Sequence, residues 1–434
     1  MNEPTFNSRG QIEENALKNN TRSNYIWNML GTVSSSLISV TLLLLASRLL
    51  TPFYSDIFSI AYALGQQFFV LGYFQVRNLQ ATDIKEKYKF SAYHNTRIFT
   101  VFLMLVTTLF YILWQGYDTY KASIVFLLIL YRAIDAYSDV FQGFFQQKSR
   151  SDLAGKIQFY RSWFCILVFA LVLWLTKSLM GASVAICCMN FLLTFPLDFK
   201  NYRRYFSSES LWSTFNGKFK SIFSILKHSF PLFLNGFLIT YIYNEPKIVI
   251  DQLLAEGILP SGMQRDFNIL FMPVFVLSLL FFVLRPLTTQ LSIYWAEKKY
   301  NTFFKQVNIL YVIMMMLGML IIVLGYFLGT EILGIVYGIN LVKYKIPFTI
   351  LLIGGILNVL ALVVDIIMTI FRKQSYLMSA YVITFLVSKG ITSSLIKAQD
   401  ITGAANSFLI SMTIYFAISF LIYFTMKYQL KKEK

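Results

Sequence analysis

Five polar residues recur along one apolar stretch of the sequence and are the strongest candidates for chemistry. They are spaced by three, four, three and four residues: Arg132, Asp135, Asp139, Gln142 and Gln146. This spacing puts them on one face of a helix. If that helix crosses a membrane, ionised groups on it are costly unless they are paired or hydrated. The stripe therefore predicts either a buried polar seam that fixes helix packing or the wall of a hydrated pathway for a substrate or an ion.

Arg161, in the next apolar stretch, is a candidate partner for this stripe. The two stretches are expected to run antiparallel around a turn near Arg150, which puts Arg161 at about the depth of Asp139. We therefore predict an ion pair between Asp139 and Arg161.

A proline stands between a carboxylate and an amine in the run Tyr241-Ile-Tyr-Asn-Glu-Pro-Lys-Ile-Val-Ile-Asp251. Proline frees backbone carbonyls one turn earlier and kinks a helix, as in the broken helices of transporters. Glu245 is therefore a candidate site for a coupling proton or sodium ion, and Lys247 for contact with an anionic ligand. The alternative is a kinked helix end at the outer interface, with both side chains hydrated.

Three more charged residues each have two possible roles. Asp365 lies in an apolar run from Pro347 to Phe371, so it is either a proton carrier or a structural partner of a neighbouring helix. Arg77 and Arg285 follow apolar runs and are either anchors that extend to the interface or the entrance of a phosphate-binding cavity.

Metal chemistry is not expected. His94 and His228 are far apart, and the three cysteines, Cys165, Cys187 and Cys188, lie within apolar runs. Neither a histidine cluster nor a disulfide framework follows from this pattern. We predict no metal and no cofactor other than a coupling proton or sodium ion.

The elements that position these residues are apolar blocks of about twenty residues, the length that crosses a hydrocarbon layer. The chain is 56% hydrophobic and 14% charged, against roughly 45–50% and 25% for soluble proteins. This predicts an all-α integral membrane protein without a soluble catalytic domain, and therefore not an enzyme. The expected spans are 25–49, 54–74, 98–114, 122–145, 157–175, 179–198, 228–250, 267–284, 307–328, 346–371, 375–396 and 402–426.

The twelve spans are expected to form two six-helix lobes, 25–198 and 228–426, around a central cavity. Most of the 38 lysines and arginines lie on the side of the N-terminus, so both termini are expected in the cytoplasm. This gives a cytoplasmic segment at 1–24, a basic cytoplasmic linker at 199–227 and a basic tail at 427–434. The linker suits a helix lying on anionic headgroups better than a nucleic-acid site.

An internal duplication supports the two lobes. Asp139-Val-Phe-Gln-Gly-Phe-Phe-Gln-Gln-Lys-Ser149 matches Asp365-Ile-Ile-Met-Thr-Ile-Phe-Arg-Lys-Gln-Ser375, and one offset superposes the aspartates and the serines. A looser echo relates Arg77-Asn-Leu-Gln-Ala-Thr to Arg285-Pro-Leu-Thr-Thr-Gln. Because six is even, both copies would enter the membrane in the same direction, as in parallel-repeat transporters.

The sequence resembles the polysaccharide-unit flippases of the multidrug/oligosaccharidyl-lipid/polysaccharide exporter superfamily over nearly its whole length. The resemblance rests on short patches: Arg77-Asn-Leu-Gln-Ala-Thr-Asp83, Tyr131-Arg-Ala-Ile-Asp-Ala-Tyr-Ser-Asp-Val-Phe-Gln-Gly143, Asn244-Glu-Pro-Lys-Ile-Val-Ile-Asp251, Phe271-Met-Pro273 and Arg285-Pro-Leu287.

This resemblance implies an ion-coupled flippase in the bacterial cytoplasmic membrane. Its substrate would be an oligosaccharide on an undecaprenyl pyrophosphate carrier, and its partners membrane lipids and polysaccharide assembly machinery, with no nucleic acid. Arg132, Arg161, Lys247 and Arg48 would attract the pyrophosphate or acidic sugars. The charge-balancing or ion-coupling groups would be Asp135, Asp139, Glu245 and Asp365. The alternatives are a drug or cation exporter of the same superfamily, and a membrane-embedded polymerase or acyltransferase.

Overall fold

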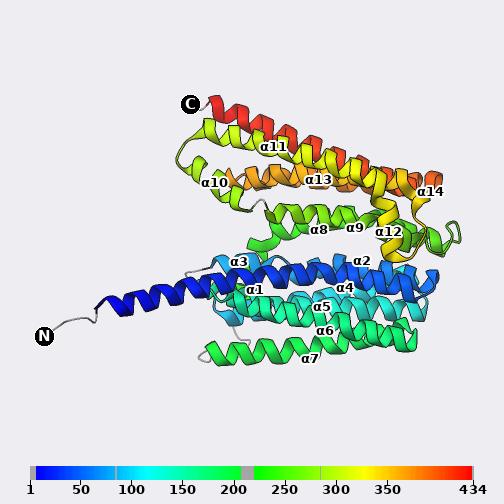
Figure 1. Cartoon of the computed structure of the whole chain (residues 1–434), viewed down its shortest axis with the longest axis horizontal. Helices are drawn as coiled ribbons and strands as arrows, with labels where there is room; N and C mark the ends of the chain where they lie inside the picture. The colour runs from blue at the N-terminus through cyan, green and yellow to red at the C-terminus, as the bar shows by residue number, and fades with distance from the viewer. Residues whose placement is uncertain (1–5, 84–85, 207–218, 284, 433–434) are drawn as a thin grey trace. The chain divides into compact units, whose positions relative to one another are not determined.

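The computed structural model describes residues 6–83, 86–206, 219–283 and 285–432, and this part of the chain is helical with no β-strand (Figure 1). The first half holds α1 (Phe6–Leu49), α2 (Pro52–Tyr73), α3 (Val76–Thr82), α4 (Phe90–Gln115), α5 (Thr119–Gln147), α6 (Ser151–Thr176) and α7 (Leu179–Phe206). The second half holds α8 (Phe219–Ala255), α9 (Met263–Val283), α10 (Arg285–Ala296), α11 (Tyr300–Leu324), a π-helical turn (Gly325–Gly329), α12 (Thr330–Tyr337), α13 (Lys345–Ile370) and α14 (Leu377–Lys432). Short 3₁₀ turns precede α13 and α14, at Val342–Tyr344 and Gln374–Tyr376.

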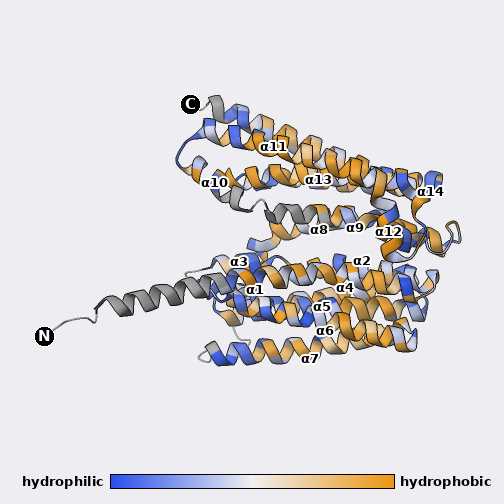
Figure 2. Cartoon of the chain, in the orientation of Figure 1, coloured by the Kyte–Doolittle hydropathy of each residue, from blue (hydrophilic) through white to orange (hydrophobic). Residues whose placement is uncertain are grey.

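The helices are those of a multi-pass membrane protein. Eight helices of the described chain are long and apolar enough to cross a membrane, and the bent pair α2–α3 makes a ninth. Helix α14 is long enough for two crossings, and Asp400 breaks it with non-helical backbone angles (φ 49°, ψ −130°). Hydrophobic residues cover most of α7, α11 and α13, whereas hydrophilic residues gather at the helix ends (Figure 2).

The exposed side chains suit lipid rather than water. Large apolar groups such as Leu113, Trp114 and Ile335 are each more than three-quarters exposed. Large apolar side chains exposed in such numbers along the helices are unusual on water-soluble monomers. Every predicted span coincides with a helix, and α14 contains the last two, which confirms the all-α membrane fold.

The chain forms two compact units, which we describe separately. The first comprises Met1–Leu49 and Leu64–Phe233, and the second Leu50–Ala63 and Leu234–Lys434. These borders differ from the predicted lobes in two places. Residues 50–63 join the second unit because the Asp56 carboxylate accepts hydrogen bonds from the backbone N–H of Gly262 (2.5 Å) and Arg265 (2.8 Å).

The second difference is at the start of α8. This segment belongs to the first unit, where the Ser224 hydroxyl lies 2.8 Å from that of Tyr88 and the Phe233 ring stacks on Phe74 at 4.0 Å. Helix α7 also continues to Phe206, into the predicted linker 199–227. The middle of that linker, 207–218, lies outside the described residues, as do residues 1–5 of the predicted N-terminal segment and 433–434 of the tail.

Close helix packing in the first unit depends on two glycines. Helix α1 packs along α6, where a Cβ on Gly155 would overlap the Trp27 carbonyl and one on Gly31 would lie 2.6 Å from the Gly155 carbonyl oxygen. Small residues allow membrane helices to approach this closely. Hydrogen bonds from Asn24 Nδ2 to the Ser149 carbonyl (2.8 Å) and from Asp152 N–H to Asn24 Oδ1 (2.9 Å) fix the same contact.

Gly155→Ala is expected to destabilise the protein by about 1–3 kcal/mol because the new methyl group forces α1 and α6 apart. The matched control is Gly390→Ala, also within a helix, where a Cβ has nothing within 4 Å. The control should leave the melting temperature in detergent unchanged or slightly higher, since alanine is the better helix former. Equal melting temperatures for the two variants would contradict the close contact.

Helix α13 is the core of the second unit. It packs against α9, α11 and α14, and two-thirds of its apolar window is buried. Its apolar faces meet side chains from each neighbour, including Phe271, Phe303 and Phe408, in one hydrophobic cluster. Asp365 is therefore carried by the most enclosed helix of its unit.

Candidate functional site

Asp135 is the centre of the first charged group in the first unit. Its carboxylate accepts a hydrogen bond from Arg132 Nη1 at 3.1 Å and lies 3.2 Å from Arg161 Nη1. Asn190 on α7 donates to the same carboxylate at 2.9 Å. All three charged side chains are 10% exposed or less. Helices α5, α6 and α7 are thus joined by one buried ion triplet.

Asp139, one turn further along α5, is the centre of a second group. Arg97 Nη2 lies 2.6 Å from one carboxylate oxygen, and Arg77 Nη1 lies 3.1 Å from the other. Arg77 also donates to the side-chain oxygens of Gln142 (3.0 Å) and Gln146 (3.2 Å). Three members of the predicted stripe therefore meet one guanidinium, as a shared helical face requires.

The predicted Asp139–Arg161 ion pair is wrong. Counted from the turn between α5 and α6, Arg161 lies midway in depth between Asp139 and Asp135. Depth alone therefore allowed either partner. Arg77 and Arg97 occupy both oxygens of Asp139, and Arg161 pairs with Asp135 instead.

Arg97 belongs to the Asp139 group but was not among the predicted site residues. The predicted span begins at residue 98, whereas helix α4 begins at Phe90 and therefore includes Arg97. Its side chain is fully buried. It also donates to the carbonyl oxygens of Gly72 (2.5 Å) and Tyr73 (2.7 Å). Those carbonyls lie where α2 ends, just before Phe74 and Gln75 take left-handed backbone angles, so Arg97 satisfies groups that the helix break leaves open.

Asp198 was also missed, because it was expected at the end of its span. Helix α7 continues past it to Phe206, so the residue is buried, and its carboxylate accepts a 2.6 Å hydrogen bond from the Ser138 hydroxyl. Gln142 donates to the same hydroxyl at 3.3 Å. We call the connected charges of the first unit the α5 cluster: Arg77, Arg97, Arg132, Arg161, Asp135, Asp139 and Asp198.

In the second unit, Glu245 and Lys247 have separate partners. Glu245 is buried and lies 3.5 Å from Lys389 Nζ on α14, a residue that the sequence reasoning did not single out. Lys247 Nζ donates to Asn244 Oδ1 at 3.2 Å and lies 4.5 Å from the centre of the Phe271 ring. Helix α8 continues as one helix through Pro246.

Asp365 is held by hydroxyl groups. Tyr381 donates to it at 2.7 Å and Tyr415 at 3.1 Å, and the two phenol oxygens lie 2.8 Å apart. Both tyrosines are buried. Among the ion pairs between described residues, none includes Asp365. Its position, which the internal duplication equates with Asp139, therefore has hydroxyl partners where Asp139 has arginines.

Two further candidates lie at helix ends. Arg48 is exposed in the last turn of α1. Arg285 begins α10, and its side chain lies outside the described part of the chain. The described residues also contain no group of three or more histidines, cysteines or carboxylates that could hold a metal ion.

Known proteins resemble this chain in structure rather than in sequence. No family model and no curated protein matches the sequence. An inward-facing multidrug resistance MATE transporter of the MOP superfamily aligns over 93% of this chain and 96% of its own, with a TM-score of 0.63 and 12% identity. The eukaryotic MATE transporter AtDTX14 aligns over 94% and 96%, with a TM-score of 0.61 and 18% identity.

The chain has the MATE transporter fold. A third structure with this fold is a MOP superfamily transporter from Pyrococcus furiosus, with a TM-score of 0.52, 14% identity and coverage of 95% of this chain and 96% of its own. Its binding pocket is described as having reverse polarity, which suggests a different function for that transporter.

Outside the membrane-spanning helices of this MATE fold, Asp83 organises the loop before α4. Its carboxylate accepts hydrogen bonds from Lys87 N–H (2.9 Å), Tyr88 N–H (3.1 Å) and the Tyr93 hydroxyl (2.9 Å). Partial burial disfavours the charged form, but these bonds and the Lys87 charge outweigh it and lower the pKa of Asp83 below its ordinary value.

The depressed pKa gives Asp83 a pH-dependent role. A carboxyl with a lower pKa in the folded state stabilises the protein above its unfolded pKa, and this contribution is lost as the pH falls through the folded pKa. Asp83→Asn should therefore lower the melting temperature at pH 7 and narrow its difference from wild type below pH 4. A constant difference across that range would contradict this role.

Proposed function

We propose that the protein is an ion-coupled exporter of the MOP superfamily that moves a polyprenyl-pyrophosphate-linked oligosaccharide across the bacterial cytoplasmic membrane. The MATE fold supports the transporter class, since the solved structures that share it are transporters. The family resemblance of the sequence patches supports the lipid-linked substrate. In this proposal both termini face the cytoplasm and no covalent bond is made or broken.

The observation that carries the proposal is the charge of the α5 cluster. Four arginines face three aspartates there. With every aspartate ionised, the described side chains of the cluster carry one more positive than negative charge inside an apolar bundle. Buried charge of this kind is costly unless it is compensated, and a pyrophosphate would compensate it through the several donors of an arginine.

Asp365 is proposed to carry the coupling ion. It is enclosed by α13 and α14, and its two tyrosines can donate to a carboxylate or reorient when the carboxyl is protonated. A proton could therefore bind and leave without moving a paired cation. Glu245, 3.5 Å from Lys389, already has a cationic neighbour and is the weaker candidate.

The coupling role can be tested with Asp365→Asn in inverted membrane vesicles. The variant should export at the rate that wild type shows without a proton gradient, because the amide binds no proton at these pH values. Tyr415→Phe is the control that keeps the carboxyl and removes one donor, and it should keep a response to the gradient. Full gradient-dependent export by Asp365→Asn would exclude Asp365 as the carrier.

The second candidate is a drug or cation exporter of the same superfamily. It is favoured by the solved multidrug resistance transporters of this fold, and the hydroxyl-lined Asp365 could bind a cationic compound. Excess positive charge in the α5 cluster opposes a cationic substrate. A strain lacking the protein should keep its resistance to cationic drugs if the anionic substrate is correct, and should lose it if the second candidate is correct.

The cellular test of the first candidate is the location of the lipid-linked sugar. A strain lacking the protein should accumulate lipid-linked oligosaccharide units on the cytoplasmic face, protected from an external hydrolase. Single units that reach the outer face but stay unpolymerised would indicate a polymerase instead. Units that reach the outer face and are polymerised at the normal rate would contradict the proposal.

A further inference from the structure

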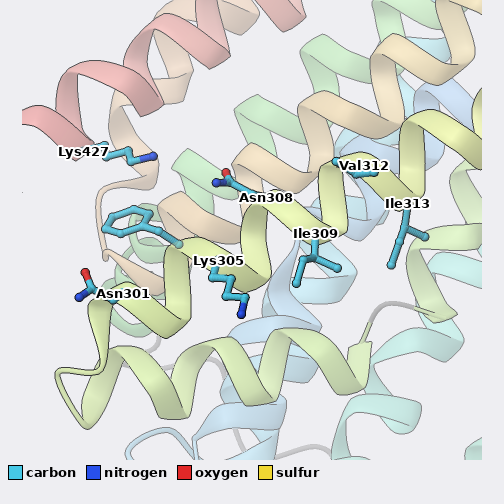
Figure 3. A pocket seen from close by; sticks show the side chains of 8 residues that line it. Asn301, Lys305, Asn308, Ile309, Val312, Ile313 and Lys427 are labelled. Atoms are coloured by element: carbon cyan, nitrogen blue, oxygen red, sulfur yellow. The ribbon is translucent and has the colours of Figure 1, made fainter.

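A second candidate binding site lies on the side of the second unit, between α11 and the end of α14. It is a cavity of about 550 Å³ that is open to the surroundings (Figure 3). Four polar residues and four apolar residues line it. The polar residues are Asn301, Lys305, Asn308 and Lys427, and the apolar residues are Phe304, Ile309, Val312 and Ile313. None of the α5 cluster takes part in it.

Among the described residues that line the polar end of this cavity are two amines and two amides, and no carboxylate. Lys427 Nζ lies 4.7 Å from the centre of the Phe304 ring. Lys305, Asn301 and Asn308 make no side-chain hydrogen bond or ion pair within the described part of the chain. These three side chains are therefore placed together beside Lys427, and an acceptor with negative charge would satisfy their donors.

The apolar end continues along the same helical face. Ile309, Val312 and Ile313 follow Lys305 at helical spacing and are 41%, 56% and 44% exposed. From Asn301 to Ile313 the helix rises about 18 Å, which is close to the depth of one bilayer leaflet, about 15 Å of hydrocarbon plus part of the headgroup layer. Polar and apolar groups thus succeed each other along the axis as they do along a lipid.

We infer that this groove binds an anionic phospholipid. The phosphodiester would lie between Lys305 and Lys427, the amides of Asn301 and Asn308 would donate to phosphate or ester oxygens, and an acyl chain would lie along Ile309, Val312 and Ile313. A free phosphate would make no contact with the apolar part of the groove. A zwitterionic lipid would bring its own cation to the two lysines, so charge complementarity favours a lipid with a net negative headgroup.

Native mass spectrometry of the purified full-length protein can test this site. The delipidated protein is titrated in a neutral detergent with phosphatidylglycerol, phosphatidylcholine or undecaprenyl phosphate. We expect wild type to retain one phosphatidylglycerol in preference to phosphatidylcholine. Lys305→Gln/Lys427→Gln should weaken that binding by about thirtyfold, from two basic contacts at the membrane surface.

The matched control is Lys220→Gln/Lys227→Gln, which removes two exposed lysines from the start of α8. It should retain the lipid as wild type does. A second variant, Val312→Asn, leaves both lysines in place and should weaken binding through the apolar half. Equal binding by wild type and the Lys305/Lys427 variant, equal loss in the control, or preference for undecaprenyl phosphate would each overturn the assignment.

Discussion

Arg161→Gln is expected to abolish export while the protein still reaches the membrane. Arg161 is buried and is one of the four arginines of the α5 cluster, whose single excess positive charge the proposed pyrophosphate would meet. Loss of one buried charged contact costs about 2–5 kcal/mol, which is about thirtyfold or more in binding. Export of lipid-linked oligosaccharide and the amount of protein in membrane fractions are the two measurements. Arg132→Ala is expected to behave in the same way.

A double variant separates transport from packing. Adding Asp135→Asn to Arg161→Gln removes one negative charge together with the positive one, so the α5 cluster keeps the net charge of wild type. If Arg161 serves substrate binding, the double variant folds but stays inactive. The control is Lys177→Gln, an exposed residue after α6, which should export normally. Restored export in the double variant would show that the Asp135 group serves helix packing and not substrate binding.

Arg97→Gln is expected to be the most destabilising single substitution in the α5 cluster. It breaks the 2.6 Å ion pair with Asp139 and frees the carbonyls of Gly72 and Tyr73. Breaking a buried ion pair from one side typically costs about 3–5 kcal/mol. The melting temperature of the purified protein in detergent should fall accordingly, together with its yield.

Two further variants test the origin of that loss. Adding Asp139→Asn to Arg97→Gln should recover part of the stability, because it removes the buried carboxylate oxygen that lost its donor, while Arg77 keeps its hydrogen bonds to Gln142 and Gln146. It should not recover all of it, since the two carbonyls remain without their donor. Arg203→Gln, on an exposed arginine of α7, should change stability by less than about 0.5 kcal/mol. A melting temperature for Arg97→Gln equal to that of Arg203→Gln would contradict the structural role.

The membrane helices could be predicted from sequence because apolar blocks of fixed length are a property of the chain itself. The same holds for the polar face of α5, since spacing alone fixes which residues share a helical face. The isolation of Asp365 from cations followed from the apolar composition of its span. These features require no knowledge of how neighbouring helices meet.

Ion-pair partners could not be predicted, because they depend on register and on irregular backbone. Arg161 was equally close in depth to two aspartates, and the choice was made by arginines on other helices. Arg97 lies before the apolar block, in a polar first part of α4 that only packing can bury. The carbonyls that it binds are available because α2 ends there and Phe74 and Gln75 take left-handed backbone angles. A hydropathy pattern does not predict such a helix break.

The internal duplication superposes two aspartates, Asp139 and Asp365, whose surroundings suit different roles. Asp139 is fixed by two arginines, whereas Asp365 is held by two tyrosines. Ion-paired groups stabilise a lobe, and a carboxyl among hydroxyl groups can exchange a proton at lower cost. We therefore expect substitutions at Asp139 to reduce stability and those at Asp365 to reduce coupling.

The most direct test of the proposed function is transfer of the substrate by the purified protein. Polyprenyl-pyrophosphate-linked oligosaccharide from the parent strain is placed in the outer leaflet of proteoliposomes, and the fraction protected from an external hydrolase is followed with and without a proton gradient. Wild type should protect the lipid-linked sugar faster than Arg161→Gln/Asp135→Asn and faster than protein-free liposomes. Equal rates for all three, or gradient-driven uptake of a cationic dye in place of the lipid-linked sugar, would contradict the proposed function.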